Sequence, residues 1–344
     1  METLITQRVH GNAGWCHIGY RDEERNAGIC IKFDKIEQVG DERNKMMVNP
    51  AIERLGFKET ERVMVLHVDD VGMCGASLDA FDDLWADQSV SCGSVMVPCP
   101  WFRATVEWSR AHPDADLGVH ATLTSEWPGY RWSPVSTRDM ASGLMDTEGA
   151  FYKTSAAVAK HADPAAVVRE LKMQIEIARD AGIPISHLDT HMGSVMDAGF
   201  YEAFVDAAME AGLAPFALRM DEAQWRAAQY GPEAIEIFSK ATDELAHMGV
   251  PLIDRVLQLS LKIENDRAQK TRNLLDRLKP GQIGYALFHP ALDSAEIRAI
   301  CPDWRSRVAD HELLSGGKLR GYLEDQGVRI INCRVLQDLV PKAS

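Results

Sequence analysis

The sequence predicts an α/β fold from residue 63 onward, either a (β/α) barrel or a doubly wound sheet. Short apolar runs alternate with longer stretches of helical periodicity, which is typical of strands and helices that follow one another along the chain. The apolar runs are rich in Val, Ile, Leu and Met without strict alternation, as expected for parallel strands buried on both faces. These two observations predict a central parallel sheet with helices around it.

The individual elements follow from the same patterns. Seven apolar runs are predicted strands, at residues 63–68, 94–97, 117–120, 185–188, 216–219, 283–288 and 328–331. The clearest helix covers residues 163–182, because Asp163 is a suitable N-cap, Pro164 suits the first helical position and Gly182 suits the end. Four further helices are predicted at residues 78–86, 200–211, 233–248 and 268–278.

Two regions stand outside this alternation. Residues 1–50 are mixed in charge and weakly periodic, so residues 1–55 are predicted to be an N-terminal extension of unknown fold before a barrel domain at residues 56–344. Residues 126–154 are rich in Trp, Pro, Ser, Gly and Tyr, which predicts a long inserted loop. Loops of this length in a compact domain usually cover or build a binding site.

Composition and charge narrow the classes of partner. The 344 residues are 46% hydrophobic and 26% charged, which excludes a disordered, collagen-like or coiled-coil chain. Lys and Arg number 37 against 51 Asp and Glu, a net charge of −14 without a basic stripe, so nucleic acid and anionic membranes are not expected partners. No apolar run approaches the ~20 residues that span a bilayer, and no signal-peptide core is present, so a cytoplasmic location is expected.

The cysteines agree with that location. Seven are present, an odd number without a CxxC pair, which is typical of reduced thiols in a cytoplasmic protein. The missing CxxC spacing also argues against a metal site built on thiolates.

Polar residues that could carry chemistry follow the ends of several predicted strands. Asp69 and Asp70 come directly after an apolar strand, at the edge where parallel sheets place their active sites. One carboxylate could bind a metal ion while the other accepts a proton from water, or the pair could cap the following helix. His120 ends another strand, and taken alone it is more typical of a hydrogen-bonded core histidine than of a ligand.

Two later strand ends repeat this pattern. His187, Asp189 and His191 lie within five positions, which favours a site for zinc or another borderline divalent cation over a polar loop that is merely rich in histidine. Asp189 can orient a metal-binding imidazole by accepting a hydrogen bond from its second nitrogen, and His187 is expected to lie outside the metal's own ligands in the same way. His289 follows the last of these strands, either as a general acid or as a histidine that bonds a backbone carbonyl.

Together, these strand ends resemble the YdjC-like carbohydrate deacetylases, the family that includes chitooligosaccharide deacetylases and deacetylases of hopanoid biosynthesis. The matching pieces are HVDDVG, GVHATLTS, SHLDTHMG and a late FHP, in the family's order, together with an ALRM segment. The resemblance extends over about residues 63–335.

The resemblance implies a deformed (β/α) barrel that holds one divalent metal ion and removes an N-acetyl group from an amino sugar or glycoconjugate. Asp69 matches the family's catalytic base, which takes a proton from metal-activated water, and His289 matches a candidate general acid near the site. Arg219 matches an arginine that touches substrate or orients a carboxylate. The residues that match the family's metal ligands are Asp70, His120 and His191.

The ligand types favour Zn²⁺ over Mg²⁺, because magnesium prefers oxygen ligands to imidazole. The sequence also departs from the family pattern: Met192 and Gly193 stand where further histidines commonly follow His191. The segment WPGYRW, which contains Trp127 and Tyr130, is unusually aromatic and is expected either to stack on a sugar or to anchor the loop.

Two other functions stay open on the sequence. A metal-dependent esterase or amidase for a non-sugar substrate would use the same residues. A non-catalytic sugar-binding protein would keep the fold with a relict site. In each case the expected partner is a small molecule or an oligosaccharide, and a homo-oligomer is compatible with the sequence.

Overall fold

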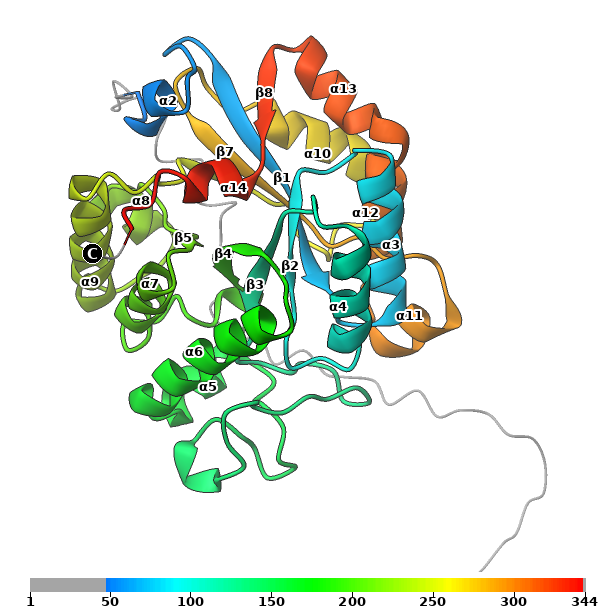
Figure 1. Ribbon diagram of the computed structural model, residues 1–344, viewed down its shortest axis with the longest axis vertical. Helices are drawn as coiled ribbons and strands as arrows, with labels where there is room; N and C mark the ends of the chain where they lie inside the picture. The colour runs from blue at the N-terminus through cyan, green and yellow to red at the C-terminus, as the bar shows by residue number, and fades with distance from the viewer. Residues whose placement is uncertain (1–47, 343–344) are drawn as a thin grey trace, which may run out of the picture.

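The computed structural model describes residues 48–342, and within them eight parallel strands form one sheet (Figure 1). The strands are β1 (Arg62–Val71), β2 (Cys92–Val95), β3 (Leu117–Ala121), β4 (Ile185–Thr190), β5 (Ala214–Pro215), β6 (Arg255–Leu257), β7 (Ile283–Phe288) and β8 (Val328–Ile331). Their order is β5-β4-β3-β2-β1-β7-β6, and β8 pairs with β1. The predicted α/β fold with a central parallel sheet is therefore confirmed.

The sheet curls until its two edges meet. β5 and β6 lie at opposite ends of the strand order, yet Leu218, after β5, forms a parallel bridge with Ile253, before β6. Backbone hydrogen bonds from Ile253 N to the Ala217 oxygen (2.9 Å) and from Arg219 N to the Ile253 oxygen (2.8 Å) make this bridge. A short contact thus joins the edges where a regular barrel would have a continuous strand pair, which gives the deformed barrel.

β1 is the central strand and has different partners along its length. Residues 63–68 pair with β7 on one side. On the other side, residues 62–65 pair with β8, and the second half, from His67 onward, pairs with β2. Along this edge of β1, the partner strand therefore changes from β8 to β2 just before His67.

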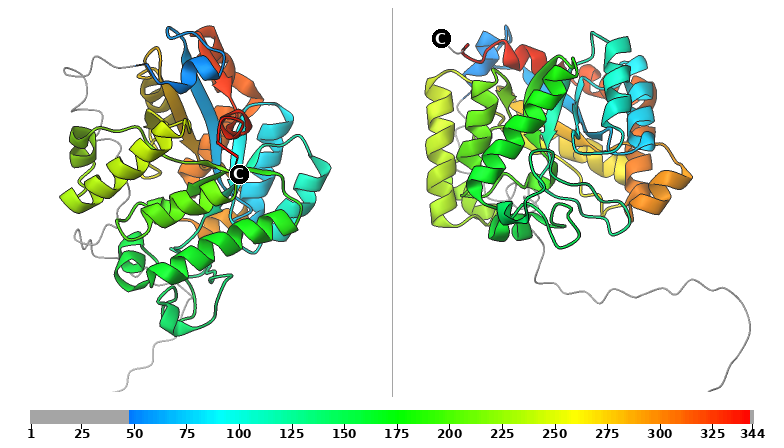
Figure 2. Two further views of the ribbon diagram at one scale, coloured as in Figure 1. Left: turned by 60° about the vertical axis from the view of Figure 1, so that its left-hand side comes forward. Right: turned by 60° about the horizontal axis from the view of Figure 1, so that its bottom comes forward.

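Helices surround the sheet (Figures 1 and 2). Five predicted helices are confirmed, with ends at most three residues from the expected ones: α3 (Gly75–Ala86), α6 (Pro164–Asp180), α7 (Tyr201–Glu210), α9 (Pro232–His247) and α10 (Arg267–Leu275). The others are α2 (Ala51–Arg54), α4 (Phe102–Ala111), α5 (Ser155–His161), α8 (Glu222–Ala227), α11 (Ala295–Ile300), α12 (Trp304–Leu314), α13 (Lys318–Asp325) and α14 (Cys333–Gln337). Most of these have eight residues or fewer, too few for a helical period to show in the sequence.

The predicted strand at residues 216–219 is wrong. The structure has β5 just before it, because the chain changes partners directly after β5. Phe216 N donates to the Leu188 oxygen of β4, whereas Arg219 N donates to the Ile253 oxygen on the other edge. β6 is not predicted by the sequence, since a run of three residues carries no periodicity.

The predicted loop at residues 126–154 is confirmed. It contains the 3₁₀ helix η1 (Met140–Ser142) and two isolated bridges, and it lies beyond the carboxyl ends of the strands (Figure 1). Two other 3₁₀ helices are η2 (His191–Gly193) and η3 (Ser315–Gly317). Most of the predicted extension, up to residue 47, lies outside the described residues; its last part includes α2, whose Ala51 and Ile52 are buried. Across residues 48–342, no helix combines the length and apolar character needed to cross a membrane.

Candidate active site

The polar strand ends converge at the carboxyl edge of the sheet. β1 carries Asp69 and Asp70, β3 carries His120, β4 carries Asp189, and His289 directly follows β7. The first four side chains are buried and that of His289 is 11% exposed. Since parallel strands all point the same way, their ends bring residues far apart in sequence to one place.

Asp69 and Asp70 both reach this place because the backbone turns between them. Neighbouring residues of a regular strand point to opposite faces. Asp70, however, has a φ of 62°, in the left-handed region that is uncommon for residues other than glycine. Gly72 continues the turn with a φ of 76°, and a Cβ there would lie 2.3 Å from Thr105 Oγ1, so the turn requires glycine at this position.

Three Lewis-basic atoms face one another at the centre of the site. Asp70 Oδ1 lies 3.1 Å from His191 Nδ1 and 3.4 Å from His120 Nε2. Asp70 Oδ1 is buried and has no hydrogen-bond partner, which is unfavourable unless a cation lies beside it. The ligand atoms of these three residues lie within 4.8 Å of one another, so the trio of Asp70, His120 and His191 could hold a metal ion.

In both His120 and His191, a carboxylate binds the outer ring nitrogen, the one that points away from Asp70. His120 Nδ1 donates to Asp189 Oδ1 at 2.8 Å, and Ser94 Oγ donates to Asp189 Oδ2 at 2.8 Å. His191 Nε2 donates to Glu126 Oε2 at 3.1 Å. These bonds turn the inner nitrogens of both rings toward Asp70. Burial alone would lower the pKa of His120 and of His191, but the surrounding carboxylates outweigh it and raise the pKa of both rings. A divalent cation would take the place of the protons on the inner nitrogens, because two imidazoles and one carboxylate are a donor set suited to it.

Arg307 of α12 lies at the other oxygen of Asp70. Its Nη1 donates to Asp70 Oδ2 at 2.7 Å, and its guanidinium lies over the ring of Trp127, 5.5 Å from the centroid. Burial alone would raise the pKa of Asp70, but Arg307 and His191 outweigh it and hold that pKa well below its ordinary value. Asp70 is therefore ionised, with one oxygen on Arg307 and the other toward the imidazoles.

Asp69 and His289 form a second pair of titratable side chains beside the trio. Asp69 Oδ1 accepts a hydrogen bond from His67 Nδ1 at 2.7 Å, while Asp69 Oδ2 lies 3.6 Å from His289 Nε2 and 3.8 Å from His120 Nε2. Burial lowers the pKa of His289 despite the nearby Asp69 and Asp70 carboxylates, so its ring is neutral at neutral pH. A carboxylate here can accept a proton and pass it to a neutral imidazole.

The other predicted site residues are not part of the trio. Tyr130 Oη donates to the Met73 oxygen at 2.8 Å and so ties the loop to the end of β1. Arg219 donates to Asp254 Oδ1 at 2.5 Å, and Asp254 Oδ2 accepts a hydrogen bond from the backbone nitrogen of Ile283, the first residue of β7. His187 is not part of the trio: its Nε2 lies 2.9 Å from His67 Nε2, behind Asp69.

Sequence reasoning missed four residues of the site: His67, Ser94, Glu126 and Arg307. His67 precedes Asp69 by two positions in the same strand, and this spacing could have indicated a shared face. Glu126 begins the loop that was expected to cover a site. Arg307 had no such signal, because α12 is not predicted by the sequence.

Comparisons with known proteins agree with this fold. The family of YdjC-like proteins matches residues 63–325. A carbohydrate deacetylase of Thermus thermophilus is 32% identical over 278 residues, which cover 80% of this chain and 94% of that protein. Carbohydrate deacetylase 1 of Listeria innocua is 22% identical over 277 residues, 79% of this chain and 99% of that protein. Among solved structures, a protein of Enterococcus faecalis assigned to cellobiose-phosphate cleavage has a TM-score of 0.63 at 18% identity, with 80% of this chain and 99% of that chain covered.

Proposed function

The chain belongs to the YdjC-like family, and on this premise we propose that it is a carbohydrate deacetylase that hydrolyses an N-acetyl group of an amino sugar or glycoconjugate with one divalent metal ion. The observation that carries the proposal is the trio of Asp70, His120 and His191, whose basic atoms face one another around an unpartnered carboxylate oxygen. The catalytic domain in this proposal is residues 56–344.

The donor set supports zinc as the ion. Two imidazole nitrogens and one carboxylate oxygen are typical of catalytic zinc sites, which keep a further position for water or substrate. Magnesium binds oxygen in preference to nitrogen, so the two histidines favour zinc. When bound, the cation supplies a Lewis acid that activates water and polarises the acetyl carbonyl.

Asp69 serves as the general base in this proposal. Its Oδ1 is engaged by His67, so Oδ2 is the oxygen that accepts a proton from water at the centre. His289 Nε2, 3.6 Å from Oδ2, receives that proton and delivers it to the sugar nitrogen as the amide bond breaks. A neutral ring suits this role, because the ring must first accept a proton.

The aromatic residues of the loop lie beside the proposed site. Trp127 lies over Arg307, which binds Asp70, and the ring of Trp132 lies 6.2 Å from that of His191. Flat aromatic faces offer apolar surface beside polar groups, a combination that sugar rings also present. Trp127 is buried against Arg307, which favours a role as an anchor of the loop. The half-buried Tyr130 is proposed to contact the sugar, and Arg219, whose side chain is 29% exposed, to contact a more distant part of the substrate.

Acetate release from N-acetylglucosamine oligomers tests this function. The Zn²⁺-loaded protein should release acetate, and Asp69→Asn should reduce kcat about 10²- to 10⁴-fold, because an amide cannot accept the proton. The asparagine variant should keep its metal content, since Asp69 is not part of the trio. Hydrolysis of simple aryl acetates without acetate release from sugars would indicate an esterase instead. No turnover on any acetylated glycan would indicate a non-catalytic protein.

Elemental analysis tests the ligands independently of activity. His120→Ala and His191→Ala should each lose one divalent ion per chain, because each removes a ligand of the trio. The matched control is His247→Ala, which removes an exposed histidine at the end of α9 and should leave the metal content unchanged. Full retention of the ion in both ligand variants would contradict the assignment.

A further inference from the structure

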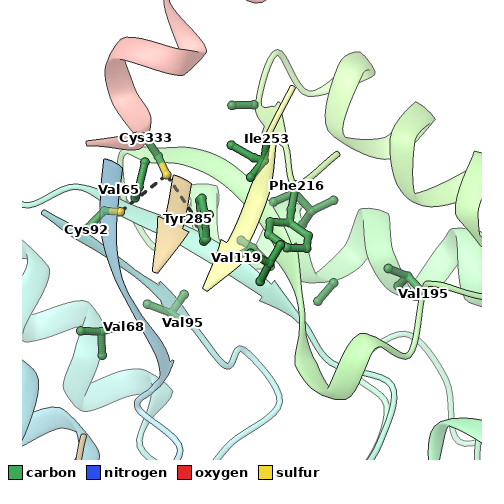
Figure 3. Packing of buried hydrophobic residues seen from close by; sticks show 14 of the residues in the cluster. Val65, Val68, Cys92, Val95, Val119, Val195, Phe216, Ile253, Tyr285 and Cys333 are labelled. Atoms are coloured by element: carbon green, nitrogen blue, oxygen red, sulfur yellow. Dashed lines mark hydrogen bonds between the residues drawn. The ribbon is translucent and has the colours of Figure 1, made fainter. Parts of the chain in front are cut away.

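A second group of metal-binding side chains lies behind the candidate active site. His67, Cys92, His187 and Cys333 form this Cys–His cluster, and none of the four is more than 3% exposed. Cys92 Sγ lies 3.5 Å from Cys333 Sγ, and His67 Nε2 lies 2.9 Å from His187 Nε2. Figure 3 shows the two thiols facing each other beside Tyr285. The ligand atoms of His67, Cys92 and His187 lie within 4.8 Å of one another.

The register of the sheet brings the two thiols together. His67 in β1 pairs with Cys92 in β2. Ile331 in β8 pairs with Val65, so Cys333, two residues later, comes level with His67. Both cysteines therefore lie on the same edge of β1, at the point where the strand that pairs with β1 changes from β8 to β2.

The two imidazoles of the cluster face each other with lone pairs. His67 Nδ1 donates to Asp69 Oδ1 at 2.7 Å. His187 Nδ1 lies 2.8 Å from Ser186 Oγ, and the Ser186 hydroxyl donates to Asp116, so His187 Nδ1 is the donor to Ser186. With Nδ1 protonated in both rings, the two Nε2 atoms each carry a lone pair. Two lone pairs repel at 2.9 Å unless a cation, either a proton or a metal ion, lies between them.

The geometry of the thiols suits a metal ion. The separation of 3.5 Å is far longer than a disulfide bond of about 2.05 Å, and both cysteines are free thiols. A tetrahedral zinc site, with bonds of about 2.3 Å to sulfur and about 2.0 Å to nitrogen, has sulfur–sulfur edges of about 3.8 Å and nitrogen–nitrogen edges of about 3.3 Å. The two separations in the cluster are each within about half an ångström of these edges.

We propose that the Cys–His cluster is a structural metal site that binds Zn²⁺, separate from the ion at Asp70, His120 and His191. His67, Cys92 and His187 supply three ligands, and Cys333, 3.5 Å from Cys92, supplies the fourth, as in structural zinc sites, so this ion has no position for substrate. Binding displaces the proton between the imidazoles together with the thiol protons of the two cysteines and releases them to solvent. Because His67 also donates to Asp69, the ion holds that carboxylate in place from behind.

Cobalt substitution tests the site in the full-length wild-type protein. Co²⁺ bound by thiolate gives a sulfur-to-metal charge-transfer band in the near ultraviolet, which nitrogen and oxygen ligands do not give. The wild-type protein loaded with Co²⁺ should show this band, and the double variant Cys92→Ser/Cys333→Ser, which removes both thiols of the cluster, should lose it. The matched control, Cys301→Ser, removes another buried thiol and should keep it. Absence of the band in the loaded wild-type protein would overturn the proposal without reference to any variant.

Zinc content separates the two sites from each other. Protein produced with zinc should hold about two ions per chain, one in each site. Cys92→Ser and His120→Ala should each reduce this to about one ion per chain, and the double variant should hold none. A single ion that His120→Ala removes and Cys92→Ser retains would mean that only a proton lies between the imidazoles. That result would overturn the structural site and leave the proposed deacetylase intact.

Discussion

At the scale of the residue, hydrogen bonds to individual oxygens distinguish two adjacent carboxylates. Asp70 has Oδ2 on Arg307 and Oδ1 toward the two imidazoles, which suits a metal ligand. Asp69 has Oδ1 on His67, which leaves Oδ2 toward His289 to accept a proton. Neighbours of identical chemistry therefore receive different roles from the atoms that are already bonded.

The neutral state of His289 predicts the pH dependence of hydrolysis. Burial lowers the pKa of His289, so its ring gains a charge only as the pH falls well below neutral. A charged ring cannot accept the proton from Asp69, so kcat/KM should decrease toward acid pH through this lowered pKa. His289→Gln should be about 100-fold slower and should lack this acid limb. If the limb is unchanged in the pH profile of the glutamine variant, another group is responsible for it.

At the scale of the element, two helices fix the backbone that carries His289. Arg267 of α10 and Asp310 of α12 form a buried ion pair at 2.6 Å. Asp310 Oδ2 also accepts a hydrogen bond from the backbone nitrogen of His289 at 3.2 Å. The chain directly after β7 is thus held by a pair of charges on helices outside the sheet.

Removal of one partner should therefore destabilise the fold strongly. Arg267→Met leaves the fully buried Asp310 carboxylate without its cation, and the free energy of unfolding should decrease by about 3–5 kcal/mol. Urea unfolding followed by circular dichroism measures this loss. The matched control is Arg298→Met, which breaks the exposed pair with Asp293 and should cause no measurable loss. Equal effects in the two variants would refute a special role for the buried pair.

At the scale of the whole molecule, the 126–154 loop is fastened over the carboxyl end of the barrel. Glu126 binds His191 at its start, and Tyr130 bonds the Met73 oxygen. Farther along, the buried Glu170 of α6 accepts hydrogen bonds from the backbone nitrogens of residues 135 and 136, at 3.0 and 2.8 Å. Several distant elements thus hold the loop beside the candidate active site.

Glu170→Ala should release the middle of this loop. The two backbone nitrogens lose their acceptor, which should lower the free energy of unfolding by about 1–3 kcal/mol. Limited proteolysis should cut faster within residues 133–140, while the metal content should stay unchanged because Glu126 still binds His191. Glu176→Ala on the exposed face of the same helix is the control and should change neither measurement. Unchanged proteolysis in Glu170→Ala would mean that other contacts hold the loop.

Local patterns predicted the elements in which short-range signals dominate. Asp163 caps α6 and Pro164 occupies its first turn, as expected, because capping depends on residues a few positions apart. The predicted strand at 216–219 failed because the chain changes partners there, and the choice of partner depends on residues far away along the chain. A run of apolar residues shows that a segment is buried, but not which strand it pairs with.

The sequence by itself determined the α/β class, the long loop and the order of the polar strand ends, because these follow from composition and short spacings. Only the tertiary structure decided that Arg307 reaches Asp70, across 237 positions, and that Cys92 and Cys333 meet across 241. The missing CxxC spacing argued against a thiolate site, yet the register of β8, β1 and β2 brings the two thiols to 3.5 Å. The physical reason is that strand register is selected by burial over the whole sheet, so contacts between strands carry no signal in the local sequence.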